Sequence, residues 1–243
     1  MPTSQKDPLR MEKERLVVFS GAGVSAESGI RTFRDHDGLW EEYRIEDVAT
    51  PEAWIKDPAT VLRFYDQRRA QVMAALPNPA HRAIAALEAA FHVDVITQNI
   101  DDLHERAGSS RVLHLHGEIM KARGTAHPEQ VVSLNGPSLR IGDQCPLGSQ
   151  LRPHIVWFGE EVPMMPKAAE IIAQADRILV VGTSLQVYPA AGLVHYAPAN
   201  AMVVVIDPAA LELRRAGVRY IKAKASEGVP QLAFEWGVKD LIG

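Results

Sequence analysis

The sequence of 243 residues contains a single cysteine, Cys145. One thiol cannot form a disulfide within the chain, and this cysteine usage is typical of a reducing compartment. Residues 1–13 are polar and contain no apolar run of signal-peptide length, and no later stretch reaches the ~20 apolar residues of a membrane span. We therefore expect a cytoplasmic protein without membrane contact, whose residues 1–13 form a loosely held leader.

Excess charge of either sign is also small, with a formal net charge of -4. A mildly acidic chain lacks the basic surface that attracts phosphate backbones, so we expect no direct binding of nucleic acid. Hydrophobic residues make up 47% and charged residues 23% of the chain, as in ordinary globular proteins. The absence of internal repeats excludes a solenoid.

What the sequence does contain is a series of short apolar runs, each ending in small or polar residues. The runs are Leu16–Ser20, Val93–Thr97, Val112–His116, Ile155–Phe158, Ile178–Gly182 and Met202–Ile206. Helical patterns lie between many of them, at Ala80–Ala90, Pro166–Gln174 and Pro189–Ala197. This alternation predicts an α/β fold with a parallel sheet covered on both faces.

Two segments interrupt the alternation. Residues 36–79 contain the helical stretch Pro58–Leu76 but no obvious strand, and residues 117–153 are rich in glycine, proline and polar residues. We predict an open parallel Rossmann-type sheet domain made of residues 14–35, 80–116 and 154–243. Residues 36–79 and 117–153 are predicted to form a smaller inserted lobe, with a cleft between the two.

The first apolar run continues directly into a G-x-G-x-x-A sequence, Gly21 to Ala26. Glycines at such a strand-to-helix junction allow a tight turn and close approach of the backbone to a pyrophosphate, and a purely structural turn is the alternative. A dehydrogenase would show a second strand ending in an acidic residue about 20 residues later, and this chain does not. Asp207 is instead the candidate ribose partner, unless Asp207-Pro208 only turns the chain.

Taken with five later blocks, this turn resembles the sirtuin family of NAD-dependent protein-lysine deacylases. The blocks occur in the family's order and are Gly21–Ser25 with Gly29–Arg34, Thr97–Asp101, His114–Glu118, Phe158–Glu160 and Val181–Leu185. The resemblance implies a Rossmann-type domain, NAD in the cleft and an acyl-lysine protein or peptide between the lobes. The residues that it implies at NAD are Gly21, Ala22, Gly23, Ile30, Arg31, Phe33, Arg34, Gln98, Asn99, Ile100, Asp101, Gly182, Thr183, Ser184, Asp207 and Ala225.

Three residues are implied in catalysis. Asn99 and Asp101 would line the nicotinamide pocket, and His116 would be the general base that deprotonates a ribose hydroxyl, which suits an imidazole titrating near neutrality. The alternatives are an ordinary hydrogen-bonded histidine, or a metal-binding pair with His114 for which no further ligand is evident. Asp102 is better explained as a helix N-cap.

Two features depart from most sirtuins. The two C-x-x-C pairs that hold a structural zinc in the family are missing, because only Cys145, His127 and His154 lie in or beside that interval. We therefore predict a small lobe without zinc. Val205 stands where an asparagine often contacts the adenosine ribose, so we expect micromolar or weaker NAD affinity unless Asp207 or backbone groups compensate.

The acyl group is indicated by Tyr65 and Arg68, which lie three residues apart on one helical face. They resemble the Y-x-x-R signature of sirtuins that remove succinyl, malonyl and glutaryl groups, because arginine provides a bidentate fork for a carboxylate. The alternative is a solvated basic patch with Arg63 and Arg69. The substrate backbone is expected to add as a strand along Val156, Trp157, Phe158 and Gly159.

Two other functions use the same features. An ADP-ribosyltransferase or NAD hydrolase would cleave the same nicotinamide bond but deliver the ribose to another acceptor or to water. A non-catalytic sensor would bind NAD or ADP-ribose and regulate a partner. We expect deacylation of succinyl-lysine or malonyl-lysine, as well as acetyl-lysine, rather than either of these two functions.

Overall fold

The computed structural model describes residues 13–30, 39–40, 43–183, 185, 189–209, 213 and 215–239. Its main element is a six-stranded sheet in the order β11-β10-β9-β1-β4-β5, in which every neighbouring pair is parallel. The predicted α/β fold with an open parallel sheet is therefore confirmed. The strands are β1 (Arg15–Ser20), β4 (His92–Thr97), β5 (Val112–His114), β9 (Arg177–Val181), β10 (Met202–Ile206) and β11 (Val218–Ile221).

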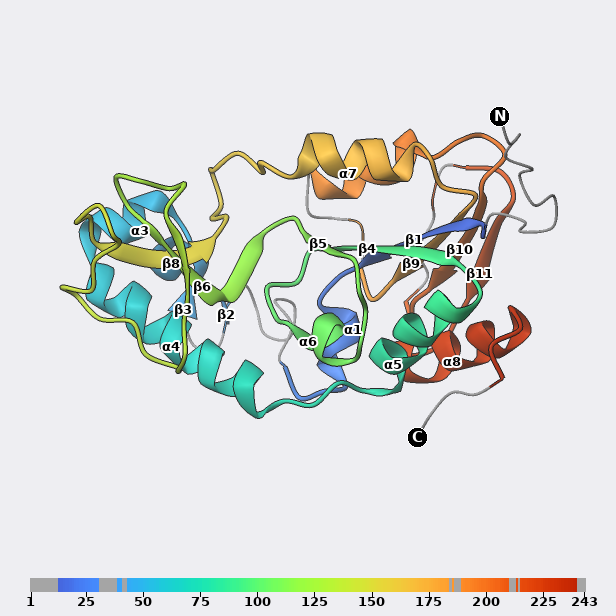
Figure 1. The fold of residues 1–243 in the computed structure, drawn as a ribbon, viewed down its shortest axis with the longest axis horizontal. Helices are drawn as coiled ribbons and strands as arrows, with labels where there is room; N and C mark the ends of the chain where they lie inside the picture. Colours follow the sequence, from blue (N-terminus) through green and yellow to red (C-terminus); the bar gives the residue numbers. More distant parts are fainter. Residues whose placement is uncertain are drawn as a thin grey trace, which may run out of the picture.

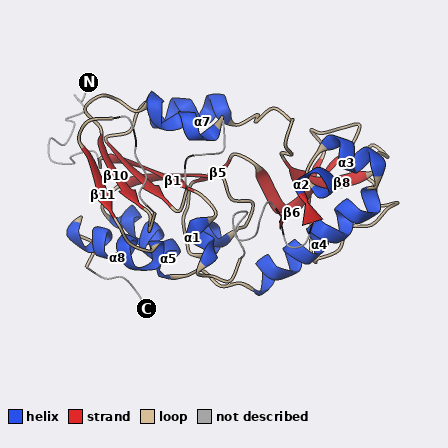
Figure 2. Cartoon of the chain, turned by 180° about the vertical axis from the view of Figure 1, so that it is seen from behind, coloured by secondary structure: helices blue, strands red, loops and turns tan. Residues whose placement is uncertain are grey.

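Helices cover both faces of this sheet (Figures 1 and 2). Side chains of β1 alternate between the two faces, so that Leu16 and Val18 enter one apolar core while Val17 and Phe19 enter the other. The first core is closed by α1, α5 and α8, and the second by α7 and the 3₁₀ helix η2. Their bounds are α1 Gly23–Ala26, α5 Pro79–Ala86, α7 Met165–Ile172, η2 Ala190–Tyr196 and α8 Ala225–Glu235.

The strand order changes direction at β1: β4 and β5 follow on one side of it, and β9, β10 and β11 follow on the other. The turns that follow β1 and β9 meet there, because Gly23 N–H donates to the Gly182 carbonyl at 2.8 Å. A Cβ on Gly182 would lie 2.2 Å from the backbone nitrogen of Val24, and the φ of Gly182 is +61°. The crevice beside such a reversal is where open α/β sheets bind ligands.

Gly182→Ala tests this close approach. We expect the free energy of unfolding to fall by at least about 2 kcal/mol, because the added methyl meets backbone and the left-handed conformation disfavours alanine. Urea denaturation measures the change. Gly192→Ala is the matched control, since a Cβ there meets nothing within 4 Å. Equal stability of the two variants would contradict the packing argument.

A second, smaller sheet lies at the other end of the molecule (Figure 1). It is antiparallel, in the order β7-β6-β8, and is accompanied by a two-stranded hairpin and three helices. The elements here are β2 Leu39–Trp40, β3 Tyr43–Arg44, α2 Ile45–Val48, α3 Pro51–Lys56, α4 Pro58–Ala74, β6 Gly117–Gly124, β7 Val131–Ser133 and β8 Leu151–Ile155. These elements belong to the segments predicted as the small lobe, apart from the end of β8; the exact domain boundaries stay a prediction.

One predicted strand was wrong. The run Ile155–Phe158 was expected in the parallel sheet, but the strand is β8, which ends at Ile155 and pairs antiparallel with β6. Pro153 inside β8 obscured the pattern, and a proline is tolerated there because β8 is an edge strand. The sequence analysis also missed β11 and α8, and it did not anticipate the 3₁₀ geometry of η2. The remaining short helices are η1 (Leu87–Ala89) and α6 (Leu103–Arg106).

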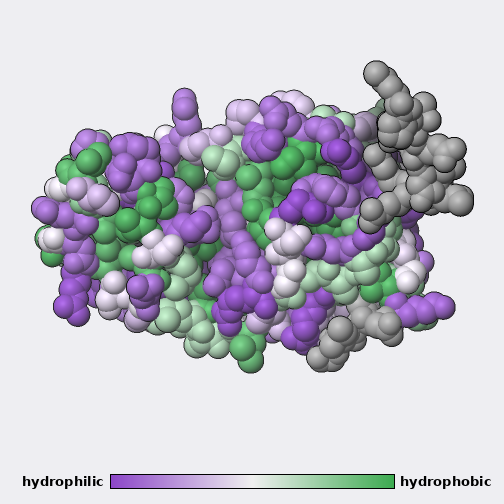
Figure 3. Space-filling model, in the orientation of Figure 1, coloured by the Kyte–Doolittle hydropathy of each residue, from purple (hydrophilic) through white to green (hydrophobic). Residues whose placement is uncertain are grey.

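Hydrophilic side chains interrupt the hydrophobic areas over the face of the molecule drawn in Figure 3. Among the described residues, no helix has both the length and the apolar character needed to cross a membrane.

Candidate functional site

A cleft of about 620 Å³ joins the crevice at the carboxyl ends of the strands to the small lobe. This volume lies within the usual range for sites of small molecules and cofactors. The residues predicted at NAD or substrate that line it are Gly21, Ala22, Gly23, Ile30, Tyr65, Arg68, Gln98, Asn99, Ile100, Asp101, His116, Val156, Trp157, Phe158, Gly159, Gly182, Thr183, Asp207 and Ala225. Arg31, Phe33, Arg34 and Ser184 lie outside the described residues.

Asn99 and Asp101 form a buried polar pair in the turn after β4, with 6% and 4% of their surfaces exposed. The Asn99 amide donates to Ser25 Oγ at 3.1 Å, and the Ser25 hydroxyl also hydrogen-bonds Asp101. Burial raises the pKa of Asp101, against the hydrogen bonds to its carboxylate. A buried amide and carboxyl on one wall of the cleft have the donors and acceptors that a carboxamide requires.

The expected capping role of Asp102 needs correction. Asp102 occupies the N-cap position of α6, but its side chain makes no capping hydrogen bond and instead lies 3.5 Å from Arg106. The Leu103 N–H donates to the Asp101 carboxylate at 3.2 Å. Asp101 therefore makes the helix-capping type of hydrogen bond that was expected of Asp102, and it also lines the cleft.

His116 follows β5 and lines the cleft. Its Nδ1 is 2.9 Å from the Gln98 carbonyl oxygen, which can only accept, so Nδ1 carries a proton. In the neutral ring Nε2 is then the basic nitrogen. Burial lowers the pKa of His116, although the Gln98 carbonyl opposes this effect. The imidazole is therefore neutral at pH 7 and able to accept a proton.

His114 does not form a metal-binding pair with His116. Its Nδ1 contacts the Asn99 carbonyl at 2.9 Å, and its Nε2 lies 2.7 Å from Glu105 Oε1. Burial alone would lower the pKa of His114, but the hydrogen bond and charge of Glu105 outweigh it and raise the pKa. Both ring nitrogens are thus engaged, and this histidine supports the turn that carries Asn99.

The donor atoms in the small lobe do not fit a tetrahedral zinc ion. The Cys145 thiol lies 3.2 Å from Ser149 Oγ. Gly124 is the residue that lies close to the Cys145 sulfur, since a Cβ built on it would be 3.0 Å from that atom. A glycine has no side chain that could serve as a second zinc ligand there. His127 Nδ1 lies 3.6 Å from a carboxylate oxygen of Glu129. Within the described part of the chain, no three His, Cys, Asp or Glu residues are grouped to hold a metal.

At the far end of the cleft, Asp207 follows β10 and Ala225 begins α8. Asp207 Oδ1 accepts the Ala209 N–H at 2.8 Å, so the turn-forming role holds even though the residue also lines the cleft. Val205 does not face the cleft. Its side chain is 2% exposed and packs in the core beneath α7, because it alternates in direction with Ile206. An asparagine at this position would therefore not reach the cleft.

Tyr65 and Arg68 lie on α4 and close the opposite end of the cleft. Tyr65 is fully buried and Arg68 is 4% exposed, whereas Arg63 faces solvent. Arg69 is also fully buried and donates to Asp66, and to the Ile119 carbonyl at 2.8 Å. The solvated-patch alternative is thus excluded for Arg68 and Arg69.

The segment Val156–Gly159 lines the cleft in irregular conformation. The N–H groups of Val156, Trp157 and Phe158 donate to the His116 carbonyl, Glu160 and the Ala49 carbonyl, respectively. Strand addition of a peptide here stays a prediction, and it would have to use other backbone groups. Glu160 and Ser25 also line the cleft, and the sequence analysis gave neither of them a role although both lie inside the recognised blocks.

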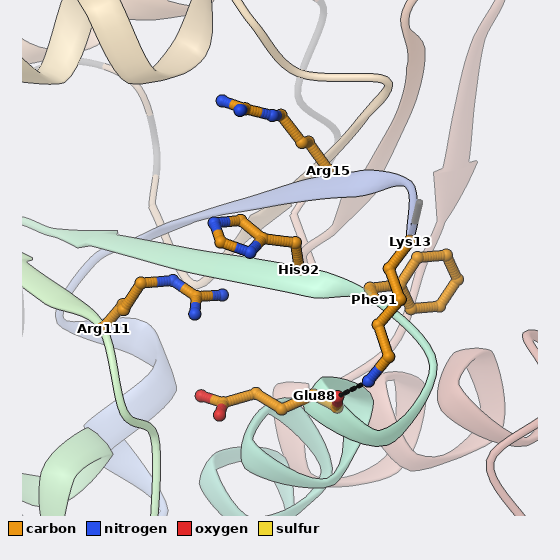
Figure 4. A pocket seen from close by; sticks show the side chains of 6 residues that line it. All are labelled: Lys13, Arg15, Glu88, Phe91, His92 and Arg111. Carbon is orange, nitrogen blue, oxygen red and sulfur yellow. Dashed lines mark hydrogen bonds between the residues drawn. The ribbon is translucent and has the colours of Figure 1, made fainter. Parts of the chain in front are cut away.

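Another cavity, of about 410 Å³, lies at the opposite edge of the sheet, where β1 and β4 begin (Figure 4). It is lined by cations, but the Lys13 amine donates to the Glu88 carbonyl at 2.8 Å and Arg111 pairs with Asp94 at 3.0 Å. Arg15 likewise donates to Gln174 at 2.5 Å. None of the residues predicted at NAD or substrate lines this cavity, so it is a weaker candidate than the cleft.

Comparison with known proteins identifies the family of this chain. The family model described as Sir2 family matches residues 21–189, which include most of the residues lining the cleft. The chain belongs to the Sir2 family. This Sir2-family chain is 53% identical over 197 residues to an NAD-dependent protein deacylase of Helicobacter pylori, covering 81% of this chain and 86% of that protein.

A second relative, the NAD-dependent protein deacylase of Vibrio cholerae, is 48% identical over 237 residues and covers 93% of this Sir2-family chain and 95% of the relative. Among solved structures, a Sir2 homologue in complex with NAD is 41% identical with a TM-score of 0.82, covering 95% and 92% of the two chains. A mutant Sir2 homologue bound to ADP-ribose has a TM-score of 0.84 at 40% identity, covering 93% and 92%.

Proposed function

We propose that this protein is an NAD-dependent protein-lysine deacylase that removes succinyl and malonyl groups as well as acetyl. One observation carries the proposal: a neutral, partly buried histidine, a buried amide–carboxyl pair and a buried arginine line one continuous cleft. The names of the relatives support NAD and protein deacylation. The choice of acyl group is supported by the residues of this chain alone.

The sheet side of the cleft fits NAD. When bound, NAD supplies the nicotinamide leaving group and the ribose that receives the acyl group. The glycine turns after β1 and β9 border the crevice, and the Gln98 amide donates to Thr183 Oγ1 at 2.9 Å, tying the two walls together. Asn99 and Asp101 would orient the carboxamide, and the crevice would hold the ribose within reach of His116.

The lobe side of the cleft fits an acyl chain that ends in a carboxylate. The guanidinium of Arg68 is buried, and desolvation strengthens its attraction for an anion. Burial also raises the pKa of Tyr65, so its phenol keeps its proton and can donate to the same carboxylate. An acetyl group leaves this end of the cleft unused, and a succinyl or malonyl group extends into it.

Incubation with NAD and either succinyl-lysine or acetyl-lysine peptide tests the proposal. We expect nicotinamide release that depends on peptide, together with O-acyl-ADP-ribose, and a higher kcat/KM for the succinyl peptide. Nicotinamide released equally fast without peptide would instead indicate an NAD hydrolase, and transfer of ADP-ribose to protein a transferase. Binding without turnover would indicate a non-catalytic sensor.

A further inference from the structure

A chain of contacts leads from Arg152, which does not line the cleft, and Glu160, which does, to the Tyr65 hydroxyl. Arg152 Nη1 and Nη2 donate to Glu160 Oε1 and Oε2 at 2.8 and 2.9 Å, which is a bidentate ion pair. Arg152 is 9% exposed. Bidentate pairs of this kind fix geometry as well as supplying energy, because both planar groups must align.

Both members of this pair hold Trp157. The guanidinium of Arg152 lies over the indole, 3.5 Å from its centroid, and the Trp157 backbone N–H donates to Glu160 Oε2 at 2.8 Å. Arg152 also donates to the Ile155 carbonyl at 3.0 Å. The indole is therefore clamped through its face and its backbone.

The clamped indole in turn sets the phenol of Tyr65. Trp157 Nε1 donates to Tyr65 Oη at 3.0 Å. An indole N–H can only donate, so the phenol oxygen is the acceptor and its own O–H remains a donor for another group. Tyr65 is fully buried and lines the cleft, so a group held in the cleft can accept this hydrogen bond.

We propose that Arg152 and Glu160 are positioning residues for acidic-acyl recognition: by clamping Trp157, they hold the Tyr65 hydroxyl in the orientation that donates to the acyl carboxylate. This inference rests on the proposed function and deepens it. It makes discrimination between succinyl and acetyl depend on an ion pair that acts through Trp157 and Tyr65.

Arg152→Lys tests the inference, because lysine keeps the charge but loses the bidentate fork and the flat face over the indole. We expect kcat/KM for succinyl-lysine peptide to fall about fivefold to tenfold, mainly through KM, as one charge-assisted hydrogen bond weakens. The kcat/KM for acetyl-lysine peptide and the KM for NAD are expected to change less than about twofold, because neither uses that bond. Glu160→Gln is expected to shift the succinyl-to-acetyl ratio in the same direction.

Arg123→Lys is the matched control. Arg123 contacts the same carboxylate, at 3.2 Å, but has no contact with the indole in the ring interactions described. Its ratio of succinyl to acetyl activity is expected to stay at the wild-type value. If Arg123→Lys shifted the ratio as much as Arg152→Lys does, the clamp would be only a general structural support and the inference would fall.

A double-mutant cycle with Tyr65→Phe identifies the route. Once the hydroxyl is gone, Arg152→Lys should cause no further change in the ratio, because the two residues act through one group. Additive effects would overturn the inference. A wild-type protein without desuccinylase activity would refute the proposed function itself, whereas an active wild type with an unchanged ratio in Arg152→Lys would refute only the positioning role.

Discussion

Replacing His116 with glutamine is expected to reduce kcat for deacylation by about 10²- to 10⁴-fold, the usual contribution of a general base. Glutamine cannot accept a proton at neutral pH, yet it retains a polar group near the Gln98 carbonyl. Steady-state release of deacylated peptide measures the loss. His92→Gln is the control, because this exposed histidine lies at the opposite edge of the sheet (Figure 4).

The pH dependence of the wild-type enzyme should report the same group. Burial lowers the pKa of His116 below its ordinary 6.5, so the base is active above its folded pKa and is lost as it protonates below it. The acid limb of kcat/KM is therefore expected below pH 6.5, since kcat/KM reports the free enzyme. Substantial activity in His116→Gln with an unchanged acid limb would assign the proton transfer to another residue.

Replacing Arg68 with methionine is expected to reduce kcat/KM for succinyl-lysine peptide by about 10- to 100-fold, equivalent to a hydrogen-bonded charge pair of about 1.5–3 kcal/mol. Deacetylation should change by less than about threefold, because an acetyl group has no charge to pair with the guanidinium. Methionine preserves much of the length and apolar surface of the side chain. Parallel assays with both peptides give the ratio directly.

Arg63→Met provides the control for this substitution, because Arg63 lies on the same helix but faces solvent. The kcat/KM for each of the two peptides should stay at the wild-type value in Arg63→Met. Loss of both activities in Arg68→Met by the same factor would mean that Arg68 supports the lobe rather than the acyl carboxylate. Thermal denaturation of each variant separates that outcome from simple unfolding.

Much of the fold could be predicted because its signals are local. β1, β4, β9 and β10 appear in the sequence as short apolar runs buried on both faces, and the glycine turn follows the first of them. The small sheet was harder, since β8 contains Pro153 and its pairing with β6 joins residues far apart along the chain. The irregular course of Val156–Gly159 depends on hydrogen bonds to His116, Ala49 and Glu160, which no local pattern reveals.

By itself the sequence determined the order of most strands and helices of the parallel-sheet domain, the residue types available for chemistry and the shortage of thiols for a zinc site. Only the tertiary structure decided which of those residues share a cleft. Nε2 of His116 is the basic nitrogen because a carbonyl from another turn engages Nδ1. Arg68 is a buried cation of the cleft instead of a solvated one. Val205 was directed into the core and the Tyr65 hydroxyl was oriented by Trp157. Such contacts depend on packing between segments distant in the sequence, and burial then alters charge and hydrogen bonding in ways that composition and spacing do not encode.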